Sequence, residues 1–532
     1  MSKYLLSPID HSALWHLSHF LSLLLVLVSL LTGLRIATMD HPWLLMFSAL
    51  LPQGYMHIWH LGAAIFWVIL IITCLIYRLF YFHTPSLKMQ RNWKNTSFLS
   101  IWGYSAMVSS VVSGVFLYFT FLSFIPWLKI HFISALALLV FLLLHIILKV
   151  LDHGIGVFKS FFPARETFTL YLTGMVGFFV AGGLLLFLLS YYEYSKLFVS
   201  RMAEDSLMTI DGKANEEIWK QTEKITLYTY GGANFYEGQS HIEIQAVENN
   251  SEIFFLVRWE DPTQSLTHLP LIKTQAGWEV VASGVYRFDE QEYYEDKLAL
   301  LFSTTREAGA AATAHLGPQP LADKMPNWHK RGYHYTHDGS IRDLWQWKAV
   351  RSNDMYQADD EFFGAPATQR DGDRRYVAGY LPDPKESGGV AMNWQWYKRG
   401  TVVPKRLPAK TNALASYFLH KSEKILRWSI PWYHYPVYKK TLDHFPLGSI
   451  LPSVLYTSNA YEGDRGHVRA RALWKNGWWT LELVRSLNTG SPYDLEIKDG
   501  IYLWVAAFDH AQTLHSRHIH PIQLCFEGID NE

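Results

Sequence analysis

Residues 130–148, IHFISALALLVFLLLHIIL, form one apolar stretch that carries two histidines, His131 and His145. The two lie fourteen residues apart. On an α-helix this separation is nearly four turns, so both rings lie on the same face, about 21 Å apart along the axis. The hydrocarbon core of a bilayer is about 30 Å thick, so a spanning helix would place one histidine near each surface. Because a polar side chain in lipid is costly without a partner, we expect both histidines to bind something.

The composition of the chain changes near residue 200. After this point charged residues, glycine, proline and tryptophan are frequent, and no apolar run is long enough to cross a bilayer. We therefore predict an all-α transmembrane helical bundle over residues 1–195 and a water-soluble domain over residues 201–532. The bundle has five segments of spanning length, at residues 12–37, 57–82, 98–122, 128–151 and 167–191.

Charge and cysteine content narrow the class of protein. The 47 basic residues balance the 47 acidic ones, so nothing favours nucleic acid as a partner. The two cysteines, Cys74 and Cys525, form no CxxC or CxxCH motif. This excludes covalent c-type haem and disfavours iron–sulfur clusters and cysteine-ligated zinc.

The distribution of lysine and arginine predicts the orientation in the membrane. The connections after the second and fourth segments are basic, whereas residues 38–56 and 123–127 contain no lysine or arginine. The positive-inside rule then places the N-terminus in the cytoplasm. With five spans, the C-terminal domain lies outside, in the periplasm of a Gram-negative cell. We expect a multi-pass protein of the inner (cytoplasmic) membrane.

This topology sorts the membrane histidines by depth. His19 falls near the cytoplasmic face with His145, and His60 falls near the outer face with His131. Two depth-matched pairs on facing helices are the arrangement that bis-imidazole ligation of haem b requires. We therefore expect two haems b in the membrane domain. The alternative ligands on the same segments are His16 and His57.

The first 190 residues resemble the di-haem cytochrome b subunits of nickel–iron hydrogenases and formate dehydrogenases. The resemblance rests on His19 followed by the LTG that ends at Gly33, on HLGAA starting at His60, and on the two histidines of the fourth segment. It implies electron transfer linked to the quinone pool, with quinone as an exchangeable substrate.

The soluble domain contains short runs of alternating residues, such as HIEIQAV, EIFFLVRW and GWWTLELVR, separated by turn signals. This pattern predicts an all-β antiparallel sandwich. Residues 303–420 show little periodicity and are too long for a simple connection, so we expect a ligand-wrapping insertion there.

Ordered blocks within residues 204–528 resemble the haem-binding domain of the ethylbenzene dehydrogenase γ-subunit type, to which subunits of dimethylsulfide dehydrogenase and selenate reductase are related. The blocks include DGKANEEIWK, IFFLVRWEDPTQS, IRDLWQWKAVR and SRHIHPIQL. The resemblance implies a β-sandwich holding one haem b near one end. Its members use a methionine before the WxW block and a lysine near the C-terminal strand. These positions fall on or nearest to His334 and His518 here, so the resemblance implies that two histidines replace the usual ligands.

Several residues near these positions have alternative roles. Trp345 either stacks on the porphyrin or belongs to the core, and Glu295 with Asp296 is better explained as a salt-bridged strand end than as an acid–base pair. A zinc site among the histidines is disfavoured, because zinc sites have tighter spacing or cysteines. The rival axial ligands are Met325, His329, His337 and His520.

These patterns predict a membrane-bound, multi-haem b-type cytochrome that transfers electrons between the quinone pool and an extracytoplasmic redox protein or oxidoreductase complex. It would be a component of a respiratory oxidoreductase rather than a self-contained enzyme. Two alternatives remain open. One is a membrane-anchored sensor or small-ligand-binding sandwich without haem in the soluble domain. The other is a quinol-dependent reductase.

Overall fold

The computed structural model describes two compact units, Met1–Glu193 with Leu316–Pro318, and Tyr194–His315 with Gln319–Glu532. The described residues are 11–81, 98–119, 124–155, 168–189, 195–203, 207–284, 289–306, 313–318, 320–321, 323, 331–368, 376–398, 401–410 and 429–527.

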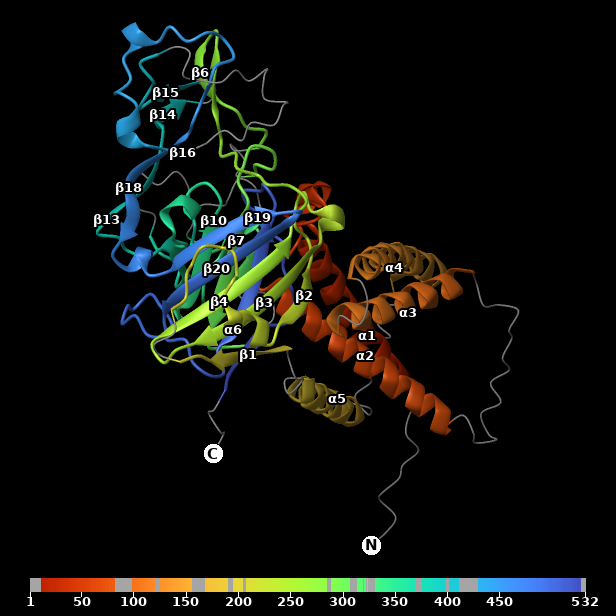
Figure 1. The fold of residues 1–532 in the computed structure, drawn as a ribbon. Coiled ribbons are helices and arrows are strands. Elements are labelled where there is room, and N and C mark those ends of the chain that lie inside the picture. The colour runs from red at the N-terminus through yellow and green to blue at the C-terminus, as the bar shows by residue number, and fades with distance from the viewer. Residues whose placement is uncertain are drawn as a thin grey trace. The chain divides into compact units, whose positions relative to one another are not determined.

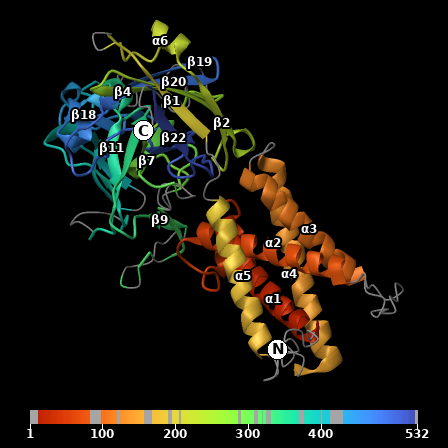
Figure 2. The same cartoon turned by 90° about the horizontal axis from the view of Figure 1, so that it is seen from below.

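The first unit is helical (Figure 2). Its α-helices are α1 (His11–Ala37), α2 (Met56–Tyr81), α3 (Phe98–Phe119), α4 (Phe124–His153) and α5 (Phe168–Leu189), with the 3-10 helix η1 at Pro42–Phe47. Four stretches of the described residues are long and apolar enough to cross a membrane: Leu17–Ala37, Met56–Ile76, Phe98–Phe119 and Pro126–Leu151. In α5 the corresponding apolar stretch, Leu172–Leu184, is shorter. The expected fifth span therefore stays a prediction.

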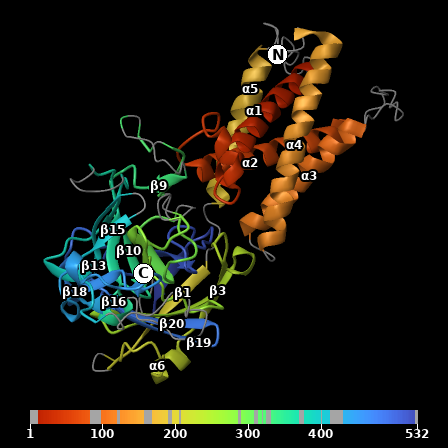
Figure 3. The ribbon, with the colours of Figure 1, turned by 90° about the horizontal axis from the view of Figure 1, so that it is seen from above.

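The helices pack as two neighbouring pairs. α1 lies along α2, and α3 lies along α4, while α1 also lies between α4 and α5 (Figure 3). Small apolar clusters hold these contacts, one of them formed by Leu17, Leu21, Leu70 and Phe178. Large apolar side chains such as Leu24, Ile72 and Val108 are exposed on the outer faces. Outward-facing apolar residues on helices of this length are what a lipid environment requires.

The second unit is built on one twelve-stranded sheet (Figure 1). Its strands, in spatial order, are β12 (Tyr380–Pro382), β11 (Asp359–Phe363), β10 (Arg342–Lys348), β7 (Lys297–Ser303), β21 (Tyr502–Phe508), β22 (Ile522–Phe526), β1 (Ser195–Arg201), β3 (Ser240–Glu248), β4 (Glu252–Glu260), β20 (Trp478–Ser486) and β19 (Arg469–Lys475), with β2 (Ile225–Thr229) also paired to β3.

This sheet curls so that distant strands face each other across one core. Phe255 on β4 contacts Trp345 on β10, and Trp259 on β4 contacts Trp347, although β4 and β10 are far apart in strand order. All four side chains are fully buried. The sheet is mixed rather than purely antiparallel, because β1 pairs in parallel with both β22 and β3. A strand inserted between two strands distant in sequence is not bound to the antiparallel direction of a hairpin.

The described residues of the stretch 303–420, where we expect a ligand-wrapping insertion, lie partly in the main sheet. The stretch supplies β10, β11 and β12 of the main sheet. Every residue of β10 is buried, so the strand lacks the alternation by which sequence identifies strands. The same stretch also supplies strands of the smaller sheets.

The remaining elements are short. The smaller sheets contain β13 (Ser387–Met392), β18 (Val454–Glu462) and β16 (Ser429–Pro431); β14 (Trp394–Lys398), β15 (Thr401–Pro404), β6 (Gly277–Val280), β5 (Leu271–Thr274) and β17 (Ile450–Leu451); and β8 (Ala314–Leu316) with β9 (Gly332–His334). The helical turns are α6 (Glu217–Gln221), η5 (Tyr236–Gly238), η7 (Asn353–Met355), η10 (Trp432–His434), η11 (Lys440–Leu442) and η12 (Asp464–Gly466).

Candidate functional site

Two pairs of histidines face each other in the helical unit. The rings of His19 on α1 and His145 on α4 have centroids 6.3 Å apart, with an angle of 62° between their planes. The rings of His60 on α2 and His131 on α4 have centroids 6.1 Å apart, at 88°. Bonds from imidazole to a transition metal are about 2 Å long, so two rings on opposite sides of one ion have centroids about 6 Å apart. Both pairs therefore have the separation that axial ligands of one metal need.

The ring of His60 is oriented by α1. Its Nδ1 lies 2.9 Å from the carbonyl oxygen of Ser29 and 3.3 Å from Oγ1 of Thr32. The Thr32 hydroxyl donates its own hydrogen to the carbonyl of Val28, at 2.7 Å, so both neighbours of Nδ1 are acceptors. His60 therefore carries its proton on Nδ1, which leaves Nε2 as the metal-binding nitrogen.

The ring of His131 has the same surroundings on α3. Its Nδ1 lies 3.1 Å from the carbonyl oxygen of Ser110 and 3.1 Å from Oγ of Ser113. The Ser113 hydroxyl donates to the carbonyl of Ser109 at 2.6 Å, so it too accepts from the imidazole. The proton of His131 is thus also fixed on Nδ1.

A glycine follows each of these acceptor pairs and leaves room for the ring. A Cβ atom on Gly33 would come within 2.9 Å of Cε1 of His60, and one on Gly114 within 3.3 Å of Cε1 of His131. The two helices therefore share the pattern Ser-x-x-Ser/Thr-Gly, at 29–33 and 110–114. This repeated pattern is the sequence signal that links the two glycines to the histidines.

One alternative membrane ligand, His57, is less well placed than His60. His57 lies in the first turn of α2, and it is the ring of His60 that faces His131. His16 lies in α1, but its side chain is outside the described residues.

In the second unit, His334 ends β9 and is partly buried. Its Nδ1 lies 3.1 Å from Oγ1 of Thr313, and its ring stacks on Phe363, with centroids 4.8 Å apart. Burial lowers the pKa of His334 to about 4, so the imidazole is neutral at physiological pH. A neutral imidazole is the form that binds a metal.

His518 differs from the expectation that it binds the haem iron, because both its ring nitrogens are engaged. Its Nδ1 donates to the carbonyl of His520 at 2.6 Å, and its Nε2 accepts from the backbone N–H of Val505 at 2.9 Å. A lone pair that accepts a hydrogen bond is not available to a metal. In this arrangement His518 fastens the segment after β21 to that strand.

His515, which the sequence reading did not single out, has the geometry expected of the ligand. Its Nδ1 donates to the carbonyl of Ser516 at 2.9 Å, which leaves the lone pair on Nε2. Burial is the main cause that lowers the pKa of His515 to about 3, and the charges of His334 and Arg517 act in the same direction. A histidine three residues before His518 was the only sequence signal for this position.

An apolar cluster connects the two imidazoles. It lies on the face of β7, β10, β11 and β21 that points away from the main core, and its buried members are Ala299, Leu301, Leu344, Phe363, Trp504 and Phe508. Phe363 contacts His334, and Phe508 contacts His515 with ring centroids 5.1 Å apart. Histidines next to an apolar surface fit a haem, which is flat and largely hydrophobic.

Trp345, for which contact with a haem and a place in the core were both open, belongs to the main core. It is fully buried, and its ring centroid lies 4.5 Å from that of Phe302. Because neighbouring residues of a strand point to opposite faces, Trp345 faces away from the cluster that contains Leu344. Trp347 lies in the same core.

Of the four rival ligands, two lie within the described residues and two do not. Met325 and His329 lie outside the described residues. The ring of His337 packs edge-on against His315, and His520 offers its carbonyl to His518. Among the described residues, two groups of side chains have spacing suited to a metal, and neither contains His315, His334 or His337.

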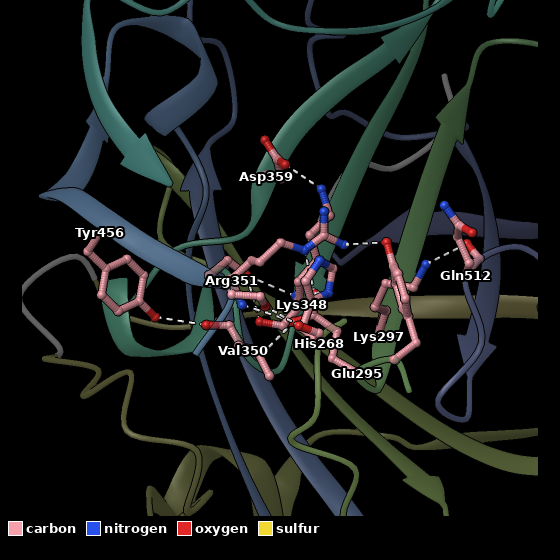
Figure 4. Close-up of polar contacts among 12 residues, drawn as sticks. His268, Glu295, Lys297, Lys348, Val350, Arg351, Asp359, Tyr456 and Gln512 are labelled. Carbon is pink, nitrogen blue, oxygen red and sulfur yellow. Dashed lines mark hydrogen bonds and ion pairs between the residues drawn. The ribbon is translucent and has the colours of Figure 1, made fainter. Parts of the chain in front are cut away.

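Of the two adjacent carboxylates Glu295 and Asp296, Glu295 forms ion pairs. Glu295 is fully buried and pairs with Arg351 and with Nδ1 of His268, the latter at 3.0 Å (Figure 4). Burial alone would raise the pKa of Glu295, but Arg351 and His268 hold it well below its usual value. The expected salt-bridged strand end is thus confirmed for Glu295, whereas Asp296 accepts hydrogen bonds from the backbone of Ser265 and from the indole of Trp479.

The protein belongs to the class that combines membrane-type helices with a β-rich domain, and histidines lie close together in each of its two units. Residues 216–519 match the family described as ethylbenzene dehydrogenase. Because this match covers more than half of the 532 residues, the chain belongs to that family. The predicted resemblance of the soluble domain is thereby confirmed. The match does not include the helices, so their resemblance to cytochrome b subunits stays a prediction.

Comparison with other proteins adds little beyond the family. No curated protein matches the chain. Among solved structures, a putative carbohydrate-binding protein from Bacteroides uniformis aligns at 8% identity and a TM-score of 0.26, covering 63% of this chain and 99% of that one. A family 9 carbohydrate-binding module from Caldicellulosiruptor kristjanssonii in complex with glucose aligns at 6% identity and a TM-score of 0.22, covering 64% and 98%. Likeness at this level gives no indication of what this chain binds.

Proposed function

We propose that the protein is a membrane-bound b-type cytochrome with three haems. Two of them bind in the helical unit, between His19 and His145 and between His60 and His131. The third binds in the β-rich unit, between His334 and His515. The observation that carries this proposal is the centroid separation of 6.3 and 6.1 Å in the two membrane pairs.

The bound haems would supply reversible one-electron chemistry. The protein contributes the ligands and their orientation. Backbone carbonyls and hydroxyls of α1 and α3 fix the proton of His60 and His131 on Nδ1 and aim Nε2 at the metal position. The helices that carry each pair consist mainly of apolar residues. Histidine in place of methionine as an axial ligand favours a lower reduction potential.

We further propose that the helical unit exchanges electrons with the quinone pool and the β-rich unit with an extracytoplasmic redox protein. Family membership and the membrane-type helices support an electron-transfer role. The basic connections after the second and fourth segments support an N-terminus in the cytoplasm of an inner membrane. The fifth segment would then carry the chain outward to a periplasmic sandwich-like domain.

Single histidine variants of the purified full-length protein test this proposal. His60→Ala, His145→Ala and His334→Ala should each remove one haem of three, measured as pyridine haemochrome per chain. His57→Ala is the matched control and should retain all three. An unchanged haem content in His60→Ala, or a loss in the control, would contradict the assignment of ligands.

A further inference from the structure

Four aspartates meet beside one arginine in the second unit, away from the histidines discussed above. Asp343 lies on β10, Asp360 lies on β11, Asp383 directly follows β12, and Asp494 lies between β20 and β21. Each of the four side chains is at most 2% exposed. Carboxylates are rarely buried so deeply without partners, so the group needs an explanation.

The group contains four acidic side chains but only one arginine to neutralise them. The Nη1 atom of Arg485 lies 2.6 Å from Asp343, 3.6 Å from Asp494 and 3.9 Å from Asp360. Within the described part of the chain, no other lysine or arginine forms an ion pair with the four aspartates. Four buried carboxylates therefore share one guanidinium, and their mutual repulsion in a low-dielectric interior is costly.

A second, independent observation concerns hydrogen bonds. Buried acceptors in proteins almost always have a donor. In this group six buried carboxylate oxygens accept no hydrogen bond from the described residues: Oδ1 of Asp343, both oxygens of Asp360, both oxygens of Asp383 and Oδ1 of Asp494. Asp360 and Asp383 thus have no donor at either oxygen. Anionic oxygens of this kind are the preferred ligands of Ca²⁺, which takes six to eight of them.

The geometry brings three candidate metal ligands close together. Ligand atoms of Asp360, Asp494 and His467 all lie within 4.8 Å of one another. The backbone N–H of Asp383 donates to the carbonyl oxygen of Asp360 at 3.1 Å, which holds these two residues side by side. His467 itself holds Asp494, with Nδ1 3.0 Å from Oδ2.

We propose that Asp360, Asp383 and Asp494 bind one Ca²⁺ ion, with Arg485 neutralising Asp343 and His467 orienting Asp494. The ion would join β11, the end of β12 and the connection before β21. β11 also carries Phe363, which stacks on His334, so the ion would stiffen the strand beside the candidate haem ligand. This inference stands on the acidic group alone and does not depend on the proposed function.

The test uses full-length protein in detergent after treatment with EGTA. Titration with CaCl₂, followed by calorimetry, should show a site that Asp383→Asn weakens at least tenfold. In thermal unfolding, the change in melting temperature caused by Asp383→Asn should have opposite signs with and without Ca²⁺. Without Ca²⁺, Asp383→Asn should melt above the wild type because it relieves repulsion; with Ca²⁺, it should melt below. Asp360→Asn should behave in the same way.

The matched control is Asp443→Asn, which removes a buried carboxylate that already has Lys273, Trp278 and Tyr438 as partners. It should lose stability equally with and without Ca²⁺ and keep the titration intact. The proposal is overturned if Asp383→Asn and the wild type respond identically to Ca²⁺, since the carboxyl groups then share protons instead. It is also overturned if Zn²⁺ or Mn²⁺ binds the site more tightly than Ca²⁺.

Discussion

At the scale of single residues, the account depends on which nitrogen of each imidazole carries the proton. His60, His131 and His515 donate from Nδ1 to a backbone carbonyl, which leaves Nε2 for a metal. His518 donates from one nitrogen and accepts at the other. Residue identity is the same in both cases, so only the hydrogen bonds separate a candidate ligand from a structural histidine.

The first prediction compares these two histidines in the β-rich unit. His515→Ala should reduce the haem content from three to two per chain, because it removes an axial nitrogen. His518→Ala should retain three haems. Pyridine haemochrome assays of the two purified variants make the comparison. Loss of haem in His518→Ala with retention in His515→Ala would reverse the assignment.

A second prediction concerns the glycine next to His60. Gly33→Val should displace the imidazole and lower the haem content, since even a Cβ atom would lie 2.9 Å from Cε1 of His60. Gly62→Val is the control, because a Cβ atom at Gly62 would contact nothing within 4 Å. Haem content and reduced-minus-oxidised spectra of both variants give the answer, and equal spectra would remove Gly33 from the proposed site.

A third prediction is the pH dependence that His518 contributes. Burial lowers its pKa to about 4, so between about pH 6.5 and 4 the unfolded chain binds a proton that the folded protein does not. Stability is therefore lost as the pH falls. His518→Gln should flatten the slope of unfolding free energy by at most about 1.4 kcal/mol per pH unit. The unfolding free energies of the wild type and of His518→Gln are measured by chemical denaturation at pH 7, 6 and 5. An equal dependence on pH in the two proteins would contradict this prediction.

At the scale of helices and strands, the sequence predicts an element well when one of its faces is buried, because apolar and polar residues then alternate with a regular period. β19 follows this rule, because its buried residues alternate with more exposed ones, and the membrane-type helices follow from their long apolar runs. β10 does not, because all seven of its residues are buried and its alternation disappears. The parallel pairing of β1 and the choice of His515 over His518 depend on contacts between distant segments, which one sequence does not reveal.

A fourth prediction concerns the buried ion pairs at the strand ends. The Nζ of Lys348 contacts Asp359 and lies 2.9 Å from Glu361, with all three side chains buried (Figure 4 shows Lys348 and Asp359). Lys348→Met should destabilise the protein by about 3–5 kcal/mol, because it leaves buried carboxylates short of a partner. Lys498→Met breaks an exposed pair with Glu496 and should cost less than about 1 kcal/mol. Similar losses in both variants, measured by chemical denaturation, would refute this difference.

At the scale of the whole molecule, composition alone separates a helical part from a β-rich part, and the family match places residues 216–519 in the ethylbenzene dehydrogenase family. The number of spans and the side of the membrane depend on the fifth helix. Its described apolar part, Leu172–Leu184, is shorter than the other four. The side on which the β-rich unit lies is therefore the property of the whole chain that most needs measurement.

A fifth prediction follows from five spans. Alkaline phosphatase fused after residue 532 should be active in a bacterial host, and green fluorescent protein fused at the same place should be dark, because the C-terminus lies outside. Fusions after residue 90, in the basic second connection, should give the opposite result. A fluorescent C-terminal fusion would instead indicate four spans.

The central claim is that facing imidazoles hold haem iron at two levels of the membrane unit and once more in the β-rich unit. Haem b per chain in the purified full-length protein, determined together with its iron content, tests this claim most directly. The account predicts three non-covalent haems b per chain. A purified, folded protein with one haem or none would contradict it.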